Sequence, residues 1–282
     1  MTTLNALSTT GLLFRTHLAS LLTSKRALVC LLLAGVPVLI ALVAAHEHHA
    51  SRVSLGIITL VLLMFVGPMI GLLLGSTVIT EEVENRTLTY AFTRPVHRGS
   101  LFLGRWLATA VLAAGIMGSS SLAVTTITST PRAGDATAHR DYDRREKKVI
   151  VSEVRRDLPE GLAIRGAVAA SLVGVLYSLL TGFLGIFLKR PMILGLGYAF
   201  AIEGLLANIP ISTQRLSLQY YLRGIVFDVD ETGGSPLLRG ELFESMRLMD
   251  LETSLMRLLV ILMLGLTVAL WAVRRRQFVL TA

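Results

Sequence analysis

Six long apolar stretches are the feature that most constrains the fold of this chain. They cover approximately residues 27–45, 53–79, 106–130, 166–188, 192–211 and 256–273. Each is close to the roughly 20 residues that an α-helix needs to cross the ~30 Å hydrocarbon core of a bilayer. None alternates like a barrel strand, and lipid cannot satisfy free backbone polar groups, so helices are expected. The sequence therefore predicts an all-α membrane protein with six transmembrane helices.

The composition agrees with this prediction. Of 282 residues, 53% are hydrophobic and 16% charged, and the mean hydropathy is +0.65, whereas about 25% of residues are charged in a soluble domain. The net charge of +8 could indicate nucleic-acid binding in a soluble protein. Here we assign the basic residues to helix flanks that face anionic lipid head groups, and expect no nucleic-acid partner. The single cysteine, Cys30, lies in an apolar run and excludes an intrachain disulfide.

The chain is interpreted as one transmembrane domain over residues 1–282. Segment 1–26 carries apolar residues at helical spacing, which predicts an amphipathic helix on the membrane surface. An ordinary cytoplasmic extension is the alternative. Segment 80–105 lies between the second and third spans, and segments 131–165 and 212–257 lie on the opposite side of the membrane.

The charges next to the spans predict the orientation. Lys and Arg are more numerous in the outer segments, but most of the excess is in 131–165, where acidic residues are interleaved. Basic residues that directly flank helices carry the most weight. These lie on the side of the two termini and comprise Lys25, Arg26, Lys189, Arg190, Arg274, Arg275 and Arg276. We therefore expect a multi-pass protein of the cell membrane with cytoplasmic N- and C-termini.

Segment 80–105 has too much pattern to be a plain linker. Its acidic start contains Glu81, Glu82 and Glu84. A short helical stretch follows with Leu88 and Phe92 on one side, and Pro95 ends it because proline lacks an amide donor. Basic residues bracket the return into the next span, namely Arg94, Arg98 and Arg105. Two short helices joined at a proline would form a rigid projection with an apolar tip, suited to docking a cytoplasmic partner.

This stretch, EEVENRTLTYAFTRPVHRGSLFLGRWLA, resembles the signature of the type-2 ATP-binding-cassette (ABC) transporter permeases. In that family, acidic residues, Gly-Thr-Leu, a proline, a basic residue and a Gly-Lys or Gly-Arg pair connect the second and third helices. The matching positions are Glu81, Glu82, Thr87, Leu88, Pro95, Arg98, Gly104 and Arg105. Arg86 stands where the family has its glycine. The six spans, the amphipathic start and the basic LKRPM turn are also similar to that family.

The resemblance implies a permease subunit of an ABC exporter, in the inner membrane of a bacterium, that forms the substrate path. Segment 80–105 would be the coupling segment that sits in a groove of a separate ATPase, with Lys189 and Arg190 as a second contact. That ATPase would bind ATP and Mg²⁺. This chain has no G-x-x-x-x-G-K-[ST] phosphate loop, so we expect no cofactor and no enzyme activity in it. A second permease, identical or related, would complete the path; the alternative is a non-transporting membrane anchor or scaffold with the same fold.

Glu203 is the one candidate for the substrate path, because a carboxylate within a span is costly and usually faces a bundle interior or water. It could instead pair with a basic residue, or be tolerated near interfacial water at the end of its helix. It stands nearly alone among the spans, so an intramembrane hydrolase is disfavoured and no catalytic residue is expected. The histidines in 46–49 and the carboxylates in 228–231 lack the spacing of known metal motifs, so no metal site is expected.

Overall fold

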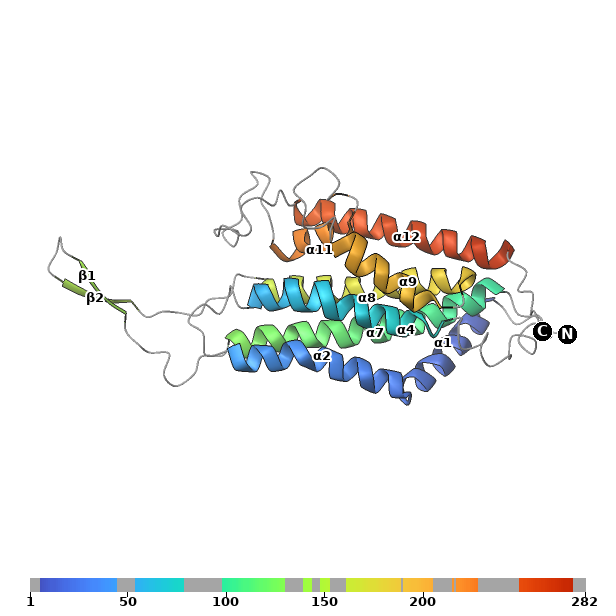
Figure 1. Ribbon diagram of the computed structural model, residues 1–282, viewed down its shortest axis with the longest axis horizontal. Helices are drawn as coiled ribbons and strands as arrows, with labels where there is room; N and C mark the ends of the chain where they lie inside the picture. Colours follow the sequence, from blue (N-terminus) through green and yellow to red (C-terminus); the bar gives the residue numbers. More distant parts are fainter. Residues whose placement is uncertain are drawn as a thin grey trace.

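The computed structural model describes residues 6–44, 54–78, 98–129, 139–143, 148–152, 161–188, 190–204, 215, 217–227 and 249–275. Helices dominate this part of the chain, as predicted, and run side by side in an elongated bundle (Figure 1). They are α1 (Ala6–Leu22), α2 (Lys25–Ala44), the π-helix η1 (Ile57–Val66), α4 (Gly67–Gly75), α7 (Arg98–Ser129), α8 (Leu162–Phe187), α9 (Pro191–Gly197), the π-helix η2 (Tyr198–Glu203), α11 (Leu218–Phe227) and α12 (Leu251–Arg275).

Five helical segments are long and apolar enough to cross a membrane. These are Lys25–Ala44, Ser54–Gly75, Gly99–Ser129, Leu162–Phe187 and Leu251–Arg275. The sixth predicted span, 192–211, appears as a shorter apolar helix over Pro191–Glu203, and residues 205–210 lie outside the described ranges. The described part of the chain therefore shows five of the six predicted spans.

The third span begins earlier than the sequence predicted. Helix α7 starts at Arg98, so residues 98–105, predicted to belong to the coupling segment, are helical and continuous with the span. The physical reason is that the nearest helix-breaking residue is Pro95, which precedes Arg98. No proline lies between Arg98 and Ser129.

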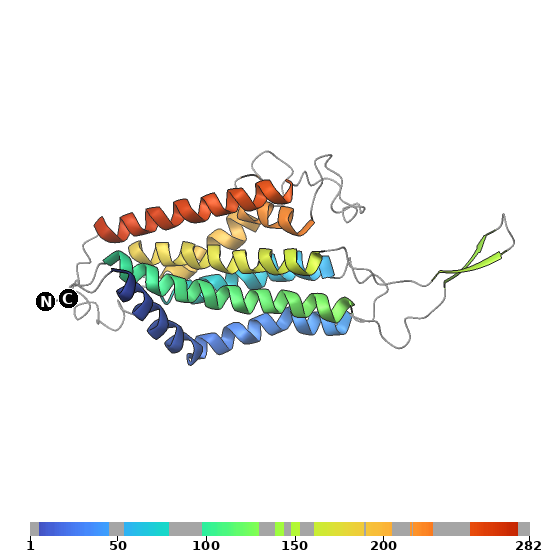
Figure 2. The ribbon, with the colours of Figure 1, turned by 180° about the vertical axis from the view of Figure 1, so that it is seen from behind.

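A short antiparallel hairpin is the one departure from an all-α fold among the described residues. Strand β1 (His139–Asp143) pairs with β2 (Lys148–Ser152), with Asp141 opposite Ile150. It lies beyond the end of the bundle in both ribbon views (Figure 2). The mixed charge of this segment indicates an outer loop, whereas its β-branched run Val149–Val151 has strand propensity.

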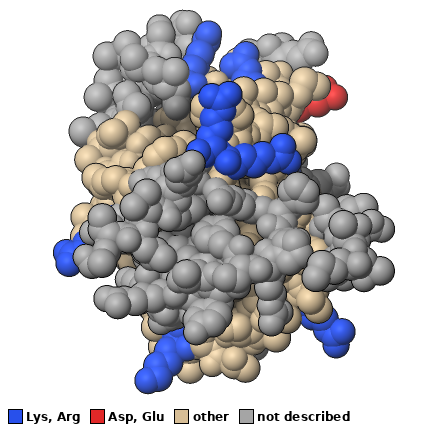
Figure 3. Space-filling model, turned by 90° about the vertical axis from the view of Figure 1, so that its right-hand side faces the viewer, with Lys and Arg blue, Asp and Glu red and all other residues tan. Residues whose placement is uncertain are grey.

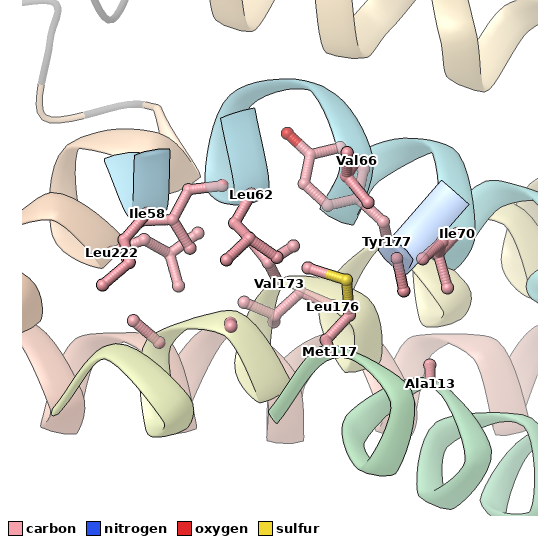
Figure 4. Packing of buried hydrophobic residues seen from close by; sticks show 14 of the residues in the cluster. Ile58, Leu62, Val66, Ile70, Ala113, Met117, Val173, Leu176, Tyr177 and Leu222 are labelled. Atoms are coloured by element: carbon pink, nitrogen blue, oxygen red, sulfur yellow. The ribbon is translucent and has the colours of Figure 1, made fainter. Parts of the chain in front are cut away.

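The centre of the bundle is built from η1, α4, α7 and α8. Side chains from these helices and from α11 meet in the interior (Figure 4), among them Ile58, Leu62, Val66, Met117, Val173 and Leu222. Glycines bring α4 against the backbone of α8: a Cβ at Gly75 would lie 2.5 Å from the carbonyl oxygen of Ser178. Such close approach is typical of helices that pack within membranes.

Helices α2 and α12 lie at the outside of the bundle. Less than a third of each apolar segment is buried, compared with more than half of each of the other three candidate spans. Both expose many large apolar side chains, including Leu32 and Val43 on α2 and Met263 and Leu264 on α12. An apolar exterior of this kind is what contact with lipid tails requires.

The two ends of the bundle differ. The starts of α1 and α7, the turn between α8 and α9, and the end of α12 lie at one end, whereas α11 and the β1–β2 hairpin lie towards the other (Figures 1 and 2). We call these the terminal end and the hairpin end. Segment 79–97 therefore leaves and rejoins the described chain at the terminal end.

Candidate functional site

The first candidate site is the place where segment 79–97 leaves the bundle. Val78, the last described residue before it, is 1% exposed, and Phe102 and Trp106 at the start of α7 are 3% and 4% exposed. All three belong to one apolar cluster that also contains Ala272 and Val273 of α12. The two ends of segment 79–97 are thus held together by packing; we call this cluster the coupling base.

Helix α1 is fitted onto the coupling base at Gly104. A Cβ at Gly104 would lie 2.8 Å from the carbonyl oxygen of Thr10 and 3.0 Å from the Cβ of Leu13. Its neighbour Arg105 directs a guanidinium nitrogen to the carbonyl oxygen of Val78 at 3.5 Å. The Gly-Arg pair singled out in the sequence therefore has two roles: the glycine admits α1, and the arginine reaches back across the root of segment 79–97.

His17 lies between α1 and the same root. Its ring nitrogen Nε2 is 3.5 Å from the hydroxyl oxygen of Thr77, and the side chain is buried. Burial, and secondarily the charge of Arg105, lower the pKa of His17 to about 4. The imidazole is therefore neutral at pH 7, because burial and a nearby positive charge both disfavour its protonated form.

Basic side chains gather at the terminal end of the molecule (Figure 3). The exposed basic residues of the elements at or near this end are Arg15, Lys25, Arg190, Arg274 and Arg275. The Arg275 guanidinium carbon lies 4.7 Å from the centre of the Trp271 ring. Such a belt suits anionic lipid head groups or an acidic protein surface.

Most residues predicted to contact a partner ATPase lie outside the described part of the chain. The positions outside the described residues are Glu81, Glu82, Thr87, Leu88, Phe92, Pro95 and Lys189. Arg98 is the first residue of α7, and Arg190 is exposed immediately before α9. The structure thus gives the base of the predicted coupling surface, and the assignment of its contact residues stays a prediction.

The second candidate site surrounds Glu203, the last residue of η2, whose side chain is fully buried. The Tyr198 hydroxyl donates to its Oε1 at 2.9 Å, and the Tyr177 hydroxyl donates to its Oε2 at 3.0 Å. A third hydroxyl, that of Ser217, is 3.4 Å from Oε2. Glu203 is thus buried among hydroxyl donors, and its assignment to the substrate path stays a prediction.

Two backbone amides complete the environment of this carboxylate. The amide of Leu218 donates to Oε1 at 3.3 Å and that of Gln219 to Oε2 at 3.2 Å. Both amides belong to the first turn of α11, where N–H groups have no partner within their own helix. Glu203 therefore caps α11 from another helix, with its negative charge at the positive end of the helix dipole. We call Glu203 and its five donor residues the Glu203 cluster.

Gln219 connects the Glu203 cluster to the other π-helix, η1. Its side-chain Nε2 donates to the carbonyl oxygen of Leu63, in η1, at 2.7 Å. The rings of Phe65 and Phe200 also join the two π-helices, with centroids 5.5 Å apart. π-Helical segments are rare in proteins, and those that occur are often at functional sites. Two of them meet beside the buried carboxylate of Glu203, which makes this part of the bundle a candidate functional site.

The sequence points to Glu203 but not to its surroundings. The cost of a carboxylate in a span pointed to Glu203 alone, while its donors come from α8, η2 and the start of α11. The available signal was the presence of Tyr177 and Tyr198 in otherwise apolar helices. Nothing in the sequence places Ser217 or Gln219 beside them.

The fold and these two sites define a multi-pass helical membrane protein with a packed base at the root of an intervening polar segment. A family model described as ABC-2 family transporter protein matches residues 11–201. The match covers well over half of the chain, and the protein therefore belongs to the ABC-2 transporter family. It is a membrane permease of the ABC transporter type, and such permeases act with an ABC ATPase. No significant match to a curated protein was found.

Proposed function

We propose that this chain is the substrate-path subunit of an ABC exporter and is driven by a separate cytoplasmic ATPase docked on segment 80–105. The observation that carries the proposal is the coupling base, which holds the residues on either side of segment 79–97 against α12. Helix α1 packs beside it at Gly104, and Arg105 reaches the carbonyl oxygen of Val78. ATP and Mg²⁺ belong to the ATPase, and this chain contributes no enzyme activity or cofactor of its own.

The coupling base is suited to convert a movement of segment 80–105 into a movement of helices. Val78 precedes segment 79–97 and Phe102 follows it, and both are almost completely buried in the coupling base. Displacing the segment would therefore displace the ends of two spans together. Close-packed interiors transmit such strain because they have few voids to absorb it. The backbone contact between Gly75 and Ser178 passes the movement from α4 to α8.

The proposed orientation places the terminal end in the cytoplasm. The exposed basic residues near that end favour the inside of the membrane, where juxtamembrane Lys and Arg accumulate. Helix α1 would lie on the inner surface of a bacterial inner membrane, and meets α2 at an angle (Figure 1). At that corner the Ser24 hydroxyl accepts a hydrogen bond from the amide of Ala27 at 3.2 Å, which caps the start of α2.

A complete transporter requires more than this chain. In the proposal, the apolar helix Pro191–Glu203 extends with the residues that follow it into the sixth span. A second permease, identical or related, faces the first across the substrate path. The partly covered apolar surfaces of α2 and α12 leave room for both lipid and a second permease at the edge of the bundle.

The proposal is tested at the apolar tip of the coupling segment. Burying Leu88 and Phe92 in an ATPase groove would contribute on the order of 1.5–3 kcal/mol each, which corresponds to about one to two decades of affinity per residue. We expect the double variant Leu88→Ser, Phe92→Ser to lose the ATPase during detergent purification of the tagged permease. The measurement is ATPase retained per permease at equal membrane abundance.

A matched control uses the same segment. Thr89→Ser and Thr93→Ser change the residues that directly follow Leu88 and Phe92, and both variants should retain the ATPase as wild type does. Retention of the ATPase by the double variant, together with normal ATP-driven activity in proteoliposomes, would show that segment 80–105 is not the coupling surface. A wild-type complex that binds the ATPase but never couples hydrolysis to movement of a solute would favour the scaffold alternative.

A further inference from the structure

We propose that Glu203 is a positioning residue whose carboxylate latches α11 to the bundle, and that α11 is released and re-latched during the transport cycle. The latched state is the one seen here. That Glu203 latches α11 concerns the permease alone. That α11 is released during transport rests on the proposed function. Glu203 and α11 lie beyond residue 201, where the family match ends.

The acceptor capacity of Glu203 is fully used by the chain itself. Oε1 accepts from Tyr198 and from the amide of Leu218, and Oε2 accepts from Tyr177, Ser217 and the amide of Gln219. Two carboxylate oxygens offer about four lone-pair sites, so five donors leave no capacity for a ligand. In the latched state Glu203 therefore acts on α11 and does not bind substrate.

Helix α11 depends on this contact because its first two amides donate to the carboxylate. The amide of Gln219 also donates to the Ser217 hydroxyl oxygen at 3.2 Å, whereas the amide of Leu218 donates to Glu203 Oε1 at 3.3 Å. Loss of the carboxylate would therefore remove the acceptor of the Leu218 amide, and an unsatisfied donor in a partly buried place is costly. The side chain of Gln219 holds the Leu63 carbonyl. The start of α11 is thus held from two sides, by η2 through Glu203 and by η1 through Gln219.

The rest of α11 fills the space between the centre of the bundle and α12. Leu222 is fully buried and lies beside Ile58 of η1 (Figure 4). On the other side of α11, a Cβ at Gly224 would lie 2.9 Å from the carbonyl oxygen of Met249, which comes just before α12. Release of α11 would therefore open the bundle at the hairpin end and expose Leu222.

A continuous helix links this latch to the terminal end. The helical segment Pro191–Glu203 begins directly after the exposed Arg190 and ends at the carboxylate. At 1.5 Å per residue such a segment spans roughly 20 Å. A shift imposed at the Arg190 turn would therefore displace Glu203 relative to the amides that it caps.

The test measures the accessibility of α11 directly. In a Cys30→Ala background, Leu222→Cys supplies a thiol that is buried while α11 is latched, and its rate of reaction with N-ethylmaleimide is measured in membranes. Glu203→Gln keeps the shape of the side chain but replaces one acceptor oxygen by a donor, so at least two of the five donors lose their acceptor. We expect the labelling rate to rise by about tenfold or more.

Two further variants separate a latch from a substrate ligand. Gln219→Leu leaves Glu203 in place but removes the bond to Leu63, and should raise the labelling of Leu222→Cys in the same way. Tyr198→Phe removes one hydroxyl and leaves both amide bonds, and should change labelling less than about threefold. A thiol at the exposed position Ile164 should react equally in all backgrounds and controls for reagent access.

Equal labelling of Leu222→Cys in wild type, Glu203→Gln and Gln219→Leu would overturn the latch. Should Glu203→Gln fail to accumulate, Gln219→Leu carries the test alone. Release of α11 during transport is measured on the complex with its ATPase. ATP should raise the labelling rate of Leu222→Cys in otherwise wild-type protein. No effect of ATP on a complex that hydrolyses it would show that α11 is a static anchor. Failure to isolate an ATPase would instead contradict the proposed function and leave the labelling result standing.

Discussion

Gly104→Ala is the substitution for which the structure gives the sharpest expectation. The added methyl group would lie 2.8 Å from the carbonyl oxygen of Thr10 and 3.0 Å from the Cβ of Leu13. Favourable contacts between heavy atoms have separations of about 3.5–4.0 Å, and the first obstacle is backbone, which no rotamer change can move. Helix α1 must therefore shift away from α7 by several tenths of an ångström.

The cost can be isolated with a control on the same helix. Overpacking of this kind costs about 1–3 kcal/mol, while replacing glycine by alanine within a helix gains up to about 1 kcal/mol. Gly115, also in α7, is exposed and has no atom within 4 Å of the corresponding Cβ position. Gly115→Ala thus reports the helix-propensity gain alone, and the difference between the two variants should be about 1–3 kcal/mol.

The assay is thermal unfolding of the purified permease in one detergent. For a chain of this size 1 kcal/mol corresponds to roughly 2–4 °C, so the Tm of Gly104→Ala should be lower than that of Gly115→Ala by about 2–12 °C. ATPase retention should decrease as well, because α1 rests on the coupling base. Equal Tm values for the two variants would refute the proposed close contact between α1 and α7.

Three further predictions use other contacts. The pKa of His17 is about 4 in the folded chain and about 6.5 in the unfolded chain. The unfolded chain therefore binds the proton first as pH falls. Up to roughly 3 kcal/mol of folding stability should be lost between about pH 6.5 and 4. Unfolding of His17→Gln should show a weaker pH dependence over that window. Gly75→Val should reduce the folded yield, since its Cβ would meet the Ser178 carbonyl oxygen at 2.5 Å, and normal yield and Tm would contradict the packing. Cysteines introduced singly as Ala91→Cys and Ala138→Cys should differ in intact cells, only the second reacting with an impermeant maleimide; the reverse pattern would invert the proposed orientation.

The sequence by itself determined the class of fold and most of the helices. Apolar runs of sufficient length are a local property, because each helix satisfies its own backbone hydrogen bonds in lipid. The five candidate spans follow from this, as did the family, which the pattern around Pro95 and Gly104 indicated. The start of α7 at Arg98 and the β1–β2 hairpin were missed because segments at the edge of a span were assigned from charge.

Only the tertiary structure decided what the polar residues within those helices do. The sequence marked Glu203 as costly, but its five donors come from α8, η2 and the start of α11, which lie up to 26 positions away in the chain. Likewise, Gly104 matched a motif in the sequence, but its role became visible only when α1 was found 2.8 Å from the position of a Cβ. Hydrogen bonding and close packing between helices depend on which faces meet, and helix periodicity alone does not specify that pairing.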